Sequence, residues 1–282
     1  MTKLFSSVRI GQLELGHRLV TTVRSGSRLE AAGYRERATA GGLVITEALR
    51  STDEVGPWER ITEAIHDRGG IAVALMAPQV ASQPAADVAI DSVMNDYQRA
   101  AQCAHAAGFD GVELDASAGS LADGFLQPRI NARDDAYGGD AERRMTFLLE
   151  AAHVVADEWS NERVGIRLSP YARDGEVELF AEVMRALSER EFAYVHLASG
   201  NPDIASAPVG RPMAIASAAA QRAFRLDLTC ALVASDHVDI RAAASAIGSR
   251  WADAIGFLQA NDDPRFIKGL LCRERLRRTL RT

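Results

Sequence analysis

The stretch from Asp96 to Leu114, DYQRAAQCAHAAGFDGVEL, contains two structural signals in direct succession. Its first part carries apolar residues at helical spacing, which predicts a helix over Asp91–Ala107. Its last part is a short apolar run, which predicts a strand over Gly111–Leu114. A helix followed at once by a buried strand is typical of βαβ construction, in which helices cover a parallel sheet.

The same alternation extends in both directions along the chain. Further apolar runs, most of them nearly continuous as expected for strands covered on both faces, predict strands over Leu19–Val23, Leu43–Glu47, Ile71–Met76, Val164–Leu168, Tyr194–Leu197, Ala231–Ala234 and Ala254–Phe257. Helical periodicity predicts helices over Pro57–Arg68, Asp140–Glu158, Val177–Arg190, Ile215–Phe224 and Asp239–Ile247. Eight strands with intervening helices predict a single (β/α)8 TIM barrel over residues 1–282.

Two features near the N-terminus refine this prediction. The segment VRIGQLELGHR alternates apolar and polar residues around Gly11, which predicts a β-hairpin that caps the barrel floor. A doubly wound sheet is the main alternative fold, and it would normally carry a GxGxxG turn after its first strand. The corresponding turn reads TTVRSGS, so we favour the barrel.

Composition limits the possible partners. The net charge of −6 comes from interspersed acidic and basic residues, which argues against nucleic acid or an anionic membrane as a partner. The chain has neither a signal-peptide pattern at its start nor an apolar stretch of about 20 residues, so we expect a cytoplasmic protein. The three cysteines lie far apart and the histidines show no HxH or HExxH spacing, so we expect no metal site.

Several segments resemble Old Yellow Enzymes, a family of FMN-dependent ene-reductases and NADH:flavin oxidoreductases. LFSSVRIGQLELGHRLV is similar to the family's N-terminal hairpin and first strand, and YRERATAGGLVITEA, from Tyr34 to Ala48, to its second βα unit. FLQPRINARDDAYGGDAERR, from Phe125 onward, resembles the signature NxRxDxYGGsxxxR. VGIRLSP, from Val164 to Pro170, is similar to the strand that carries the family's flavin-contacting arginine. The resemblance implies the same barrel.

The resemblance weakens where the family binds its substrate. The family's fourth strand ends in a His, followed three residues on by Asn or His and then by Tyr. The first two bind the substrate's electron-withdrawing group, and the Tyr delivers a proton. Here the stretch reads Asp115-Ala-Ser-Ala118-Gly-Ser120. A carboxylate at Asp115 would repel an enone oxygen that gains negative charge, so this comparison predicts altered chemistry.

The flavin contacts implied by the resemblance also differ. Ala74 replaces a Gln and Met76 a neighbouring Trp, while Ser25 stands near the place of a flavin-contacting Thr. The phosphate-binding turns after strands seven and eight read Ser235-Asp236 and Leu258-Gln259 in place of Gly-Gly and Gly-Arg, which would weaken phosphate binding. We expect the pocket to be lined by Ser25, Ala48, Ala74, Met76, Ala118, Ser120, Ser235, Asp236, Leu258 and Gln259.

Three side chains are candidates for catalysis, each with an alternative. Asp115 is predicted to be a general base, its pKa raised by an apolar wall; the alternative is a solvated or helix-capping carboxylate. Arg167 either orients an anionic or carbonyl-bearing substrate or pairs with Asp115 or Glu47. His196 either transfers protons or is a satisfied core histidine.

Other polar groups have simpler interpretations. Asp236 and His237 form either an acid–base pair or a helix N-cap. Glu47 is expected to have a structural role, and the group from Arg133 to Tyr137 is expected to brace the long loop before the next helix. Residues missing relative to the family, for example between Thr52 and Pro57, predict a more open mouth or one closed by a partner subunit in a homodimer.

We therefore favour a barrel that has lost flavin redox chemistry and holds no cofactor. It would act as an isomerase, lyase or cyclase of specialised metabolism on a mostly apolar small molecule, through Asp115, Arg167 and His196. The first alternative is an FMN-dependent NAD(P)H oxidoreductase with an atypical site. The second alternative is a catalytically inert scaffold or partner subunit.

Overall fold

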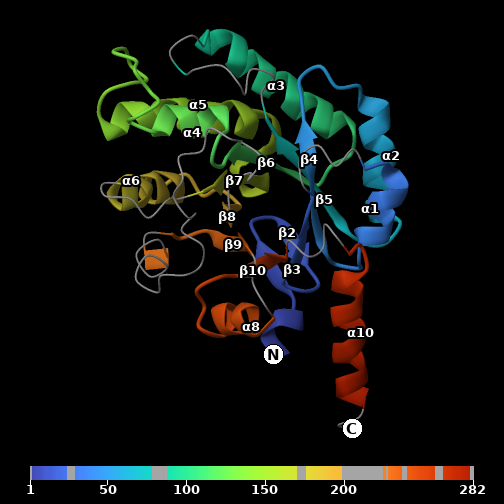
Figure 1. Cartoon of the computed structure of the whole chain (residues 1–282). Coiled ribbons are helices and arrows are strands. Elements are labelled where there is room, and N and C mark those ends of the chain that lie inside the picture. The colour runs from blue at the N-terminus through green and yellow to red at the C-terminus, as the bar shows by residue number, and fades with distance from the viewer. Residues whose placement is uncertain are drawn as a thin grey trace.

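A closed ring of eight parallel strands forms the centre of the molecule (Figure 1). The computed structural model describes residues 2–23, 29–77, 85, 88–169, 176–198, 225–226, 228–236, 240–257 and 263–279. The strands are β3 (Leu19–Thr22), β4 (Leu43–Leu49), β5 (Ile71–Met76), β6 (Gly111–Ala116), β7 (Val164–Leu168), β8 (Tyr194–Ala198), β9 (Ala231–Asp236) and β10 (Ala254–Phe257). They follow one another in chain order, and β10 closes the ring against β3. The predicted TIM barrel is confirmed.

Helices cover the outside of this ring. They are α1 (Ala31–Arg37), α2 (Val55–His66), α3 (Ile90–Ala106), α4 (Leu121–Leu126), α5 (Ala141–Trp159), α6 (Glu176–Ser188), α8 (Ile240–Gly248) and α10 (Phe266–Thr279). Helix α2 shows why such segments are helical, since Trp58, Ile61 and Ile65 recur at helical spacing and are buried on one face. Most predicted helices agree with these bounds to within two residues, whereas no bounds were predicted for α1, α4 and α10. The predicted helix Ile215–Phe224 lies outside the described residues.

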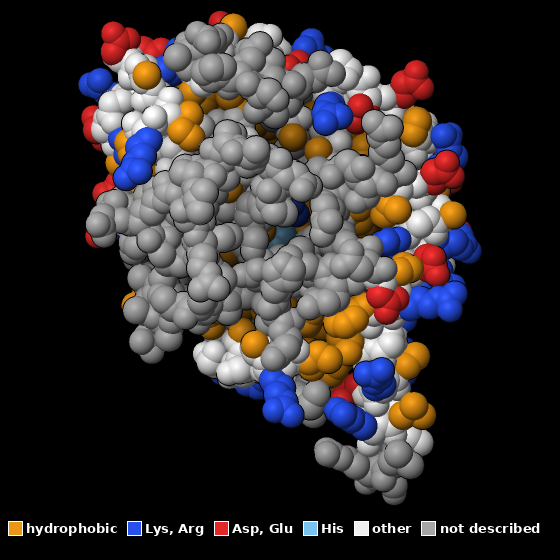
Figure 2. Space-filling model, in the orientation of Figure 1, with side chains coloured by type: hydrophobic (Ala, Val, Ile, Leu, Met, Phe, Trp, Pro, Cys, Tyr) orange, Lys and Arg blue, Asp and Glu red, His pale blue; other side chains and the backbone are white. Residues whose placement is uncertain are grey.

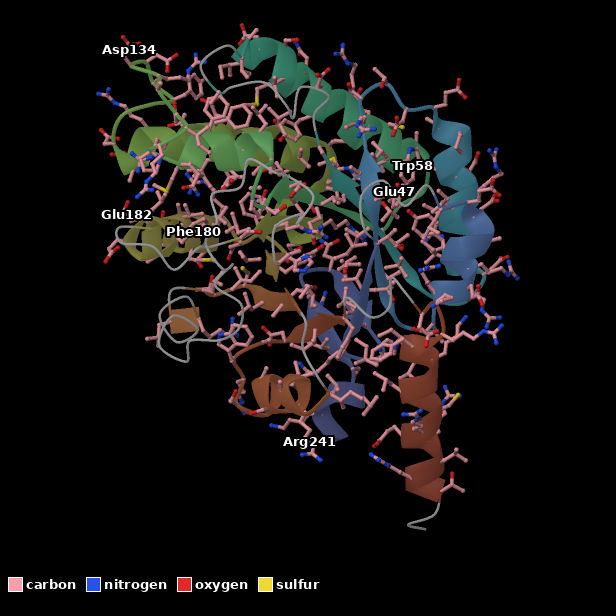
Figure 3. All side chains as sticks on the ribbon, viewed as in Figure 1. Glu47, Trp58, Asp134, Phe180, Glu182 and Arg241 are labelled. Atoms are coloured by element: carbon pink, nitrogen blue, oxygen red, sulfur yellow. The ribbon has the colours of Figure 1, made fainter. Side chains whose placement is uncertain are left out.

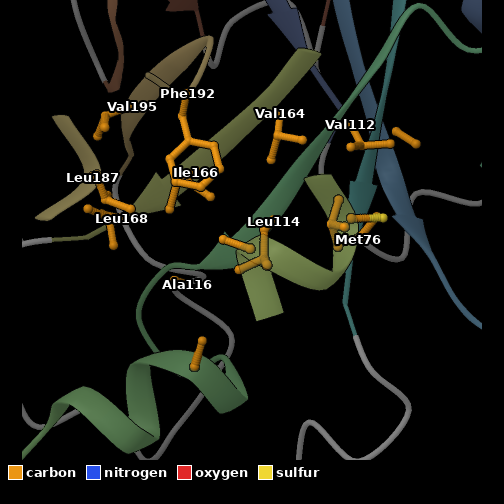
Figure 4. Packing of buried hydrophobic residues seen from close by; sticks show 14 of the residues in the cluster. Met76, Val112, Leu114, Ala116, Val164, Ile166, Leu168, Leu187, Phe192 and Val195 are labelled. Carbon is orange, nitrogen blue, oxygen red and sulfur yellow. The ribbon is translucent and has the colours of Figure 1, made fainter. Parts of the chain in front are cut away.

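The apolar residues inside the barrel and those outside it form two separate clusters. Alternate residues of the strands, such as Val73 and Leu75 of β5, pack inside with Ile45 and Tyr194. The intervening residues pack outward against the helices; Figure 4 shows Met76 in this outer cluster. Because side chains alternate between the two faces of a strand, this division shows which residues face the barrel interior.

The N-terminal hairpin closes the floor of the barrel. Strands β1 (Val8–Ile10) and β2 (Leu13–Leu15) pair antiparallel, as predicted, and their apolar residues join the interior cluster. Gly11 makes the turn with φ of 56°, and a Cβ there would lie 2.1 Å from the carbonyl oxygen of Glu162. A side chain at this position is therefore excluded both by backbone conformation and by space.

No helix in the described part of the chain is long and apolar enough to cross a membrane.

Candidate functional site

Polar side chains gather inside the barrel toward the carboxyl ends of β6 to β9. Asp115 of β6 lies opposite Arg167 of β7, and Arg167 lies opposite His196 of β8. Glu113 of β6 and Ser235 of β9 have hydrogen bonds to this group. Figure 2 shows a hollow near the middle of one face of the molecule, in which a histidine and a basic side chain are visible. This end of a TIM barrel is where such folds carry their chemistry.

The carboxylate of Glu113 is the centre of the group. It is fully buried and accepts hydrogen bonds from Arg167 Nε at 2.6 Å, Tyr194 Oη at 2.9 Å and His196 Nδ1 at 2.9 Å. Burial by itself raises the pKa of Glu113, but Arg167, His196 and Tyr194 together lower it to about 2. Glu113 is therefore ionised at neutral pH, with its charge held by donors from two neighbouring strands.

Space for one of these donors comes from a glycine. A Cβ at Gly165 would lie 2.2 Å from the ring of Tyr194, so only glycine leaves room for this ring inside the barrel. The Tyr194 hydroxyl has a pKa well above its ordinary value, because it is buried and lies beside the charge of Glu113. It therefore remains a proton donor to Glu113 at any ordinary pH.

The hydrogen bonds of His196 define its tautomer. Burial lowers the pKa of this histidine, so we take the ring to be neutral at pH 7. Its Nδ1 faces the ionised Glu113 and must carry the proton; its Nε2 then accepts from the hydroxyl of Ser235 at 2.7 Å. A Cβ at Gly256 would lie 1.8 Å from Ser235 Oγ, so glycine on β10 leaves space for this serine. His196 is thus fully hydrogen-bonded by the protein.

One guanidinium nitrogen of Arg167 is available to bind a ligand. Its Nε is bound to Glu113, whereas its Nη2 is buried and has no hydrogen-bond partner within the part of the chain that the structure describes. Burial disfavours its charge, but Glu113 and Asp115 raise its pKa above the usual range, so the guanidinium stays charged. A buried guanidinium N–H without a partner is costly, and it indicates a place where a ligand acceptor would bind. The ion-pair partner of Arg167 is Glu113, where the sequence had suggested Asp115 or Glu47.

Asp115 is partly exposed at the mouth. Its Oδ1 accepts from the backbone N–H of Ser117 at 3.0 Å and from the Ser117 hydroxyl at 2.6 Å. Its Oδ2 has no hydrogen-bond partner among the described residues, and within the same part of the chain Asp115 has no ion pair. The structure thus brings Asp115, Arg167 and His196 to one end of the barrel, as the sequence analysis expected, but it makes Glu113 the link between the last two.

The remaining predicted pocket residues that the structure describes lie inside the barrel, outside it, or in the turn after β6. Ala48 packs against the interior cluster, whereas Ala74 and Met76 belong to the outer cluster, so their side chains pack among those that face the helices (Figure 4). Ala118 is buried in the turn after β6, and Ser120 is the N-cap of α4, where its hydroxyl accepts from the N–H of Asp123. Ser25, His237, Leu258 and Gln259 lie outside the described residues, as does the side chain of Asp236.

Sequence reasoning missed Glu113 and Tyr194. The signal for Glu113 was present, because GVEL places an acidic residue within an apolar run and two positions before Asp115, on the same face of the strand. Tyr194 gave no such signal, because a tyrosine at the start of a strand is an ordinary core residue.

The loop that leads to α5 is braced as predicted. Arg133 binds Asp135 through two guanidinium nitrogens and donates to the carbonyl oxygens of Ala85 and Val88. Tyr137 donates its hydroxyl to Glu150 of α5. Asp134 extends outward at the far end of this loop (Figure 3). The signature NxRxDxY therefore holds the loop in shape and contributes no side chain to the group inside the barrel.

The fold and the site define a class of protein: a TIM barrel with a hairpin at its floor and a buried arginine at its mouth. Residues 76–212 match the model of the NADH:flavin oxidoreductase / NADH oxidase family. The 12-oxophytodienoate reductase-like protein 2A of Arabidopsis thaliana is 31% identical over 224 residues, which cover 60% of this chain and 83% of that protein. The chain belongs to this family, the Old Yellow Enzyme family.

Two further comparisons agree. The flavin oxidoreductase hxnT of Emericella nidulans is 30% identical over 230 residues, which cover 60% of this chain and 59% of that protein. The solved structure of the old yellow enzyme homologue from Zymomonas mobilis superposes with a TM-score of 0.80 at 25% identity, covering 94% of this chain and 92% of that one. The match spans about six tenths of the length of some curated relatives.

Family membership corrects the expectation about the cofactor. The expectation of a barrel without a cofactor is wrong, because the family and the structural neighbours point to FMN. They also give no support to an isomerase, lyase or cyclase. The described residues fit a flavin at one point, where Arg167 Nη2 is buried without an acceptor. Of the residues expected to meet the phosphate, Ser235 is described and its hydroxyl is hydrogen-bonded to His196. The side chain of Asp236 and the residues Leu258 and Gln259 lie outside the described residues.

Proposed function

We propose that this chain is an FMN-dependent oxidoreductase that draws its electrons from NADH or NADPH. The observation that carries the proposal is the buried Nη2 of Arg167, which points to an electron-rich acceptor inside the mouth of the barrel. Membership of a flavin oxidoreductase family supplies the identity of that acceptor. FMN, when bound, would accept a hydride from the nicotinamide and pass it to a second substrate.

In this proposal Arg167 holds the electron-rich edge of the flavin ring. A guanidinium at this point would stabilise negative charge on the bound cofactor, because the guanidinium is already held in place by Glu113. Glu113 fixes the guanidinium by binding Nε at 2.6 Å, which leaves Nη2 for the ligand. Tyr194 and His196 complete the hydrogen bonding of Glu113, and Ser235 is hydrogen-bonded to the other ring nitrogen of His196.

The phosphate end does not require the side chains that are missing. Backbone N–H groups in a turn bind phosphate whatever side chains they carry, so the loss of glycine and arginine from the turns after β9 and β10 is compatible with FMN. We expect weaker binding than a Gly-Arg pair would give, because an arginine to phosphate bond is charge-assisted.

The test is FMN uptake by the purified chain, measured from visible absorption after incubation with FMN and desalting. We expect retained flavin that is bleached by NADH or NADPH without oxygen and restored by air. Arg167→Met is expected to weaken FMN binding by roughly tenfold or more, since it removes a charge-assisted bond. Arg143→Met, at an exposed arginine of α5, is the matched control and should bind FMN normally. A folded chain that takes up no FMN would refute the proposal.

A further inference from the structure

The mouth of the barrel contains more negative than positive charge among the described residues. Arg167 is the cation, and its charge is offset by Glu113 at 2.6 Å. His196 is neutral, because burial lowers its pKa. Asp115 is a second carboxylate that lacks an ion pair within the described residues. Within the described part of the mouth, two carboxylates therefore stand against one guanidinium, and their combined field favours a positive charge.

The hydrogen bonds around Asp115 also favour a positively charged ligand. Ser117 directs both its backbone N–H and its hydroxyl to Oδ1 of Asp115, which leaves Oδ2 as an acceptor without a donor among the described residues. The adjoining Ala116 and Ala118 have no polar side-chain atoms. The end of β6 therefore offers an acceptor where a carbonyl-bearing ligand would need a donor. A carbonyl oxygen placed against Oδ2 would leave two acceptors facing each other, which is costly when both are shielded from water.

We infer that Asp115 selects a substrate with a cationic N–H donor, namely a protonated amine attached to an apolar body. This inference rests on the proposed function, because it names the class of second substrate for the same site. The carboxylate binds the ammonium group through Oδ2, and Ser117 fixes the carboxylate in the geometry that presents this oxygen. A carbonyl compound without an N–H group loses this bond and meets repulsion in its place.

The experiment compares three ligands that share one ring and differ in the attached group: cyclohexylammonium, cyclohexanone and cyclohexanecarboxylate. Their binding to the purified chain is measured by titration calorimetry at pH 7 and low salt, with and without FMN. We expect cyclohexylammonium to bind tightest and cyclohexanecarboxylate weakest. Asp115→Asn should weaken cyclohexylammonium by roughly ten- to a hundredfold, the size of a bond to a charged group, and leave cyclohexanone unchanged or improved.

The matched control is Asp134→Asn, which removes the same charge at an exposed site on the loop before α5 (Figure 3) and should change none of the three affinities. Cyclohexanone binding at least as tightly as cyclohexylammonium to the unsubstituted chain would overturn the inference. Equal loss of cyclohexylammonium in both Asp→Asn variants would also overturn it. FMN uptake, measured in the same samples, reports on the proposed function separately, so the two ideas can fail independently.

Discussion

Replacing Glu113 by Gln tests the organisation of the barrel interior. Glutamine has almost the same shape but no charge, so the variant leaves the buried guanidinium of Arg167 without its counterion. Glu113 accepts three hydrogen bonds, one through Oε1 and two through Oε2. An amide retains one acceptor oxygen and places an NH2 group where the other oxygen stood. At least one of the donor groups on Arg167, Tyr194 and His196 would then face this NH2 group, which is itself a donor.

Breaking a buried ion pair by removing one partner typically costs about 3–5 kcal/mol, and we expect Glu113→Gln to lower the free energy of unfolding by that amount. The measurement is urea denaturation followed by circular dichroism at pH 7. Glu59→Gln, at an exposed position of α2, is the matched control and should change stability by less than about 0.5 kcal/mol.

A double variant shows whether the loss comes from the uncompensated charge. Glu113→Gln combined with Arg167→Met removes both charges, so it should be less destabilising than the sum of the two single changes by about 1–3 kcal/mol. If Glu113→Gln has no larger effect than Glu59→Gln, or if the two single effects simply add, the ion pair does not stabilise this end of the barrel as argued.

Three further outcomes are expected. Burial lowers the pKa of His17 to about 4, so the unfolded chain takes up a proton first and stability should fall by roughly 2–4 kcal/mol as pH drops from 6.5 to 4, a slope that His17→Gln should reduce in urea titrations. Gly165→Ala should destabilise the fold by about 1–3 kcal/mol by overpacking the Tyr194 ring, whereas Gly248→Ala, with nothing within 4 Å of the added carbon, should be nearly neutral by the same denaturation assay. Arg133→Ala should release the loop before α5 and raise its rate of cleavage in limited proteolysis, with unchanged cleavage counting against the bracing role.

The strands and most helices could be predicted because each is a long periodic or apolar segment. The sequence could not predict which residues of β5 face the barrel interior. IAVALM is apolar at nearly every position and is buried on both faces, so its sequence contains no alternation to show which residues face inward. Only pairing with β4 and β6, which places Leu75 beside Glu113, assigns Ala74 and Met76 to the outer face.

The ion-pair partner of Arg167 also could not be predicted from the local sequence. Direct cross-strand pairing would suggest Asp115, which lies opposite it in the register. The long side chain instead extends two positions back along β6 to Glu113, a diagonal contact that depends on the twist of the barrel. The helix α4 was missed because six residues are too few for helical periodicity to be visible, although Ser120 followed by Asp123 is an N-terminal capping pattern.

The shared carboxylate of Glu113 has a consequence for how this sequence can diverge. Side chains from β7 and β8 end on one acceptor, and β9 is joined to it through His196, so no single substitution at these positions leaves the others satisfied. A lineage that loses the glutamate must alter the arginine at nearly the same time or pass through an unstable intermediate. We therefore expect these residues to be inherited as a block. Asp115, whose hydrogen bonds among the described residues go to the nearby Ser117, can change more independently and redirect the choice of substrate.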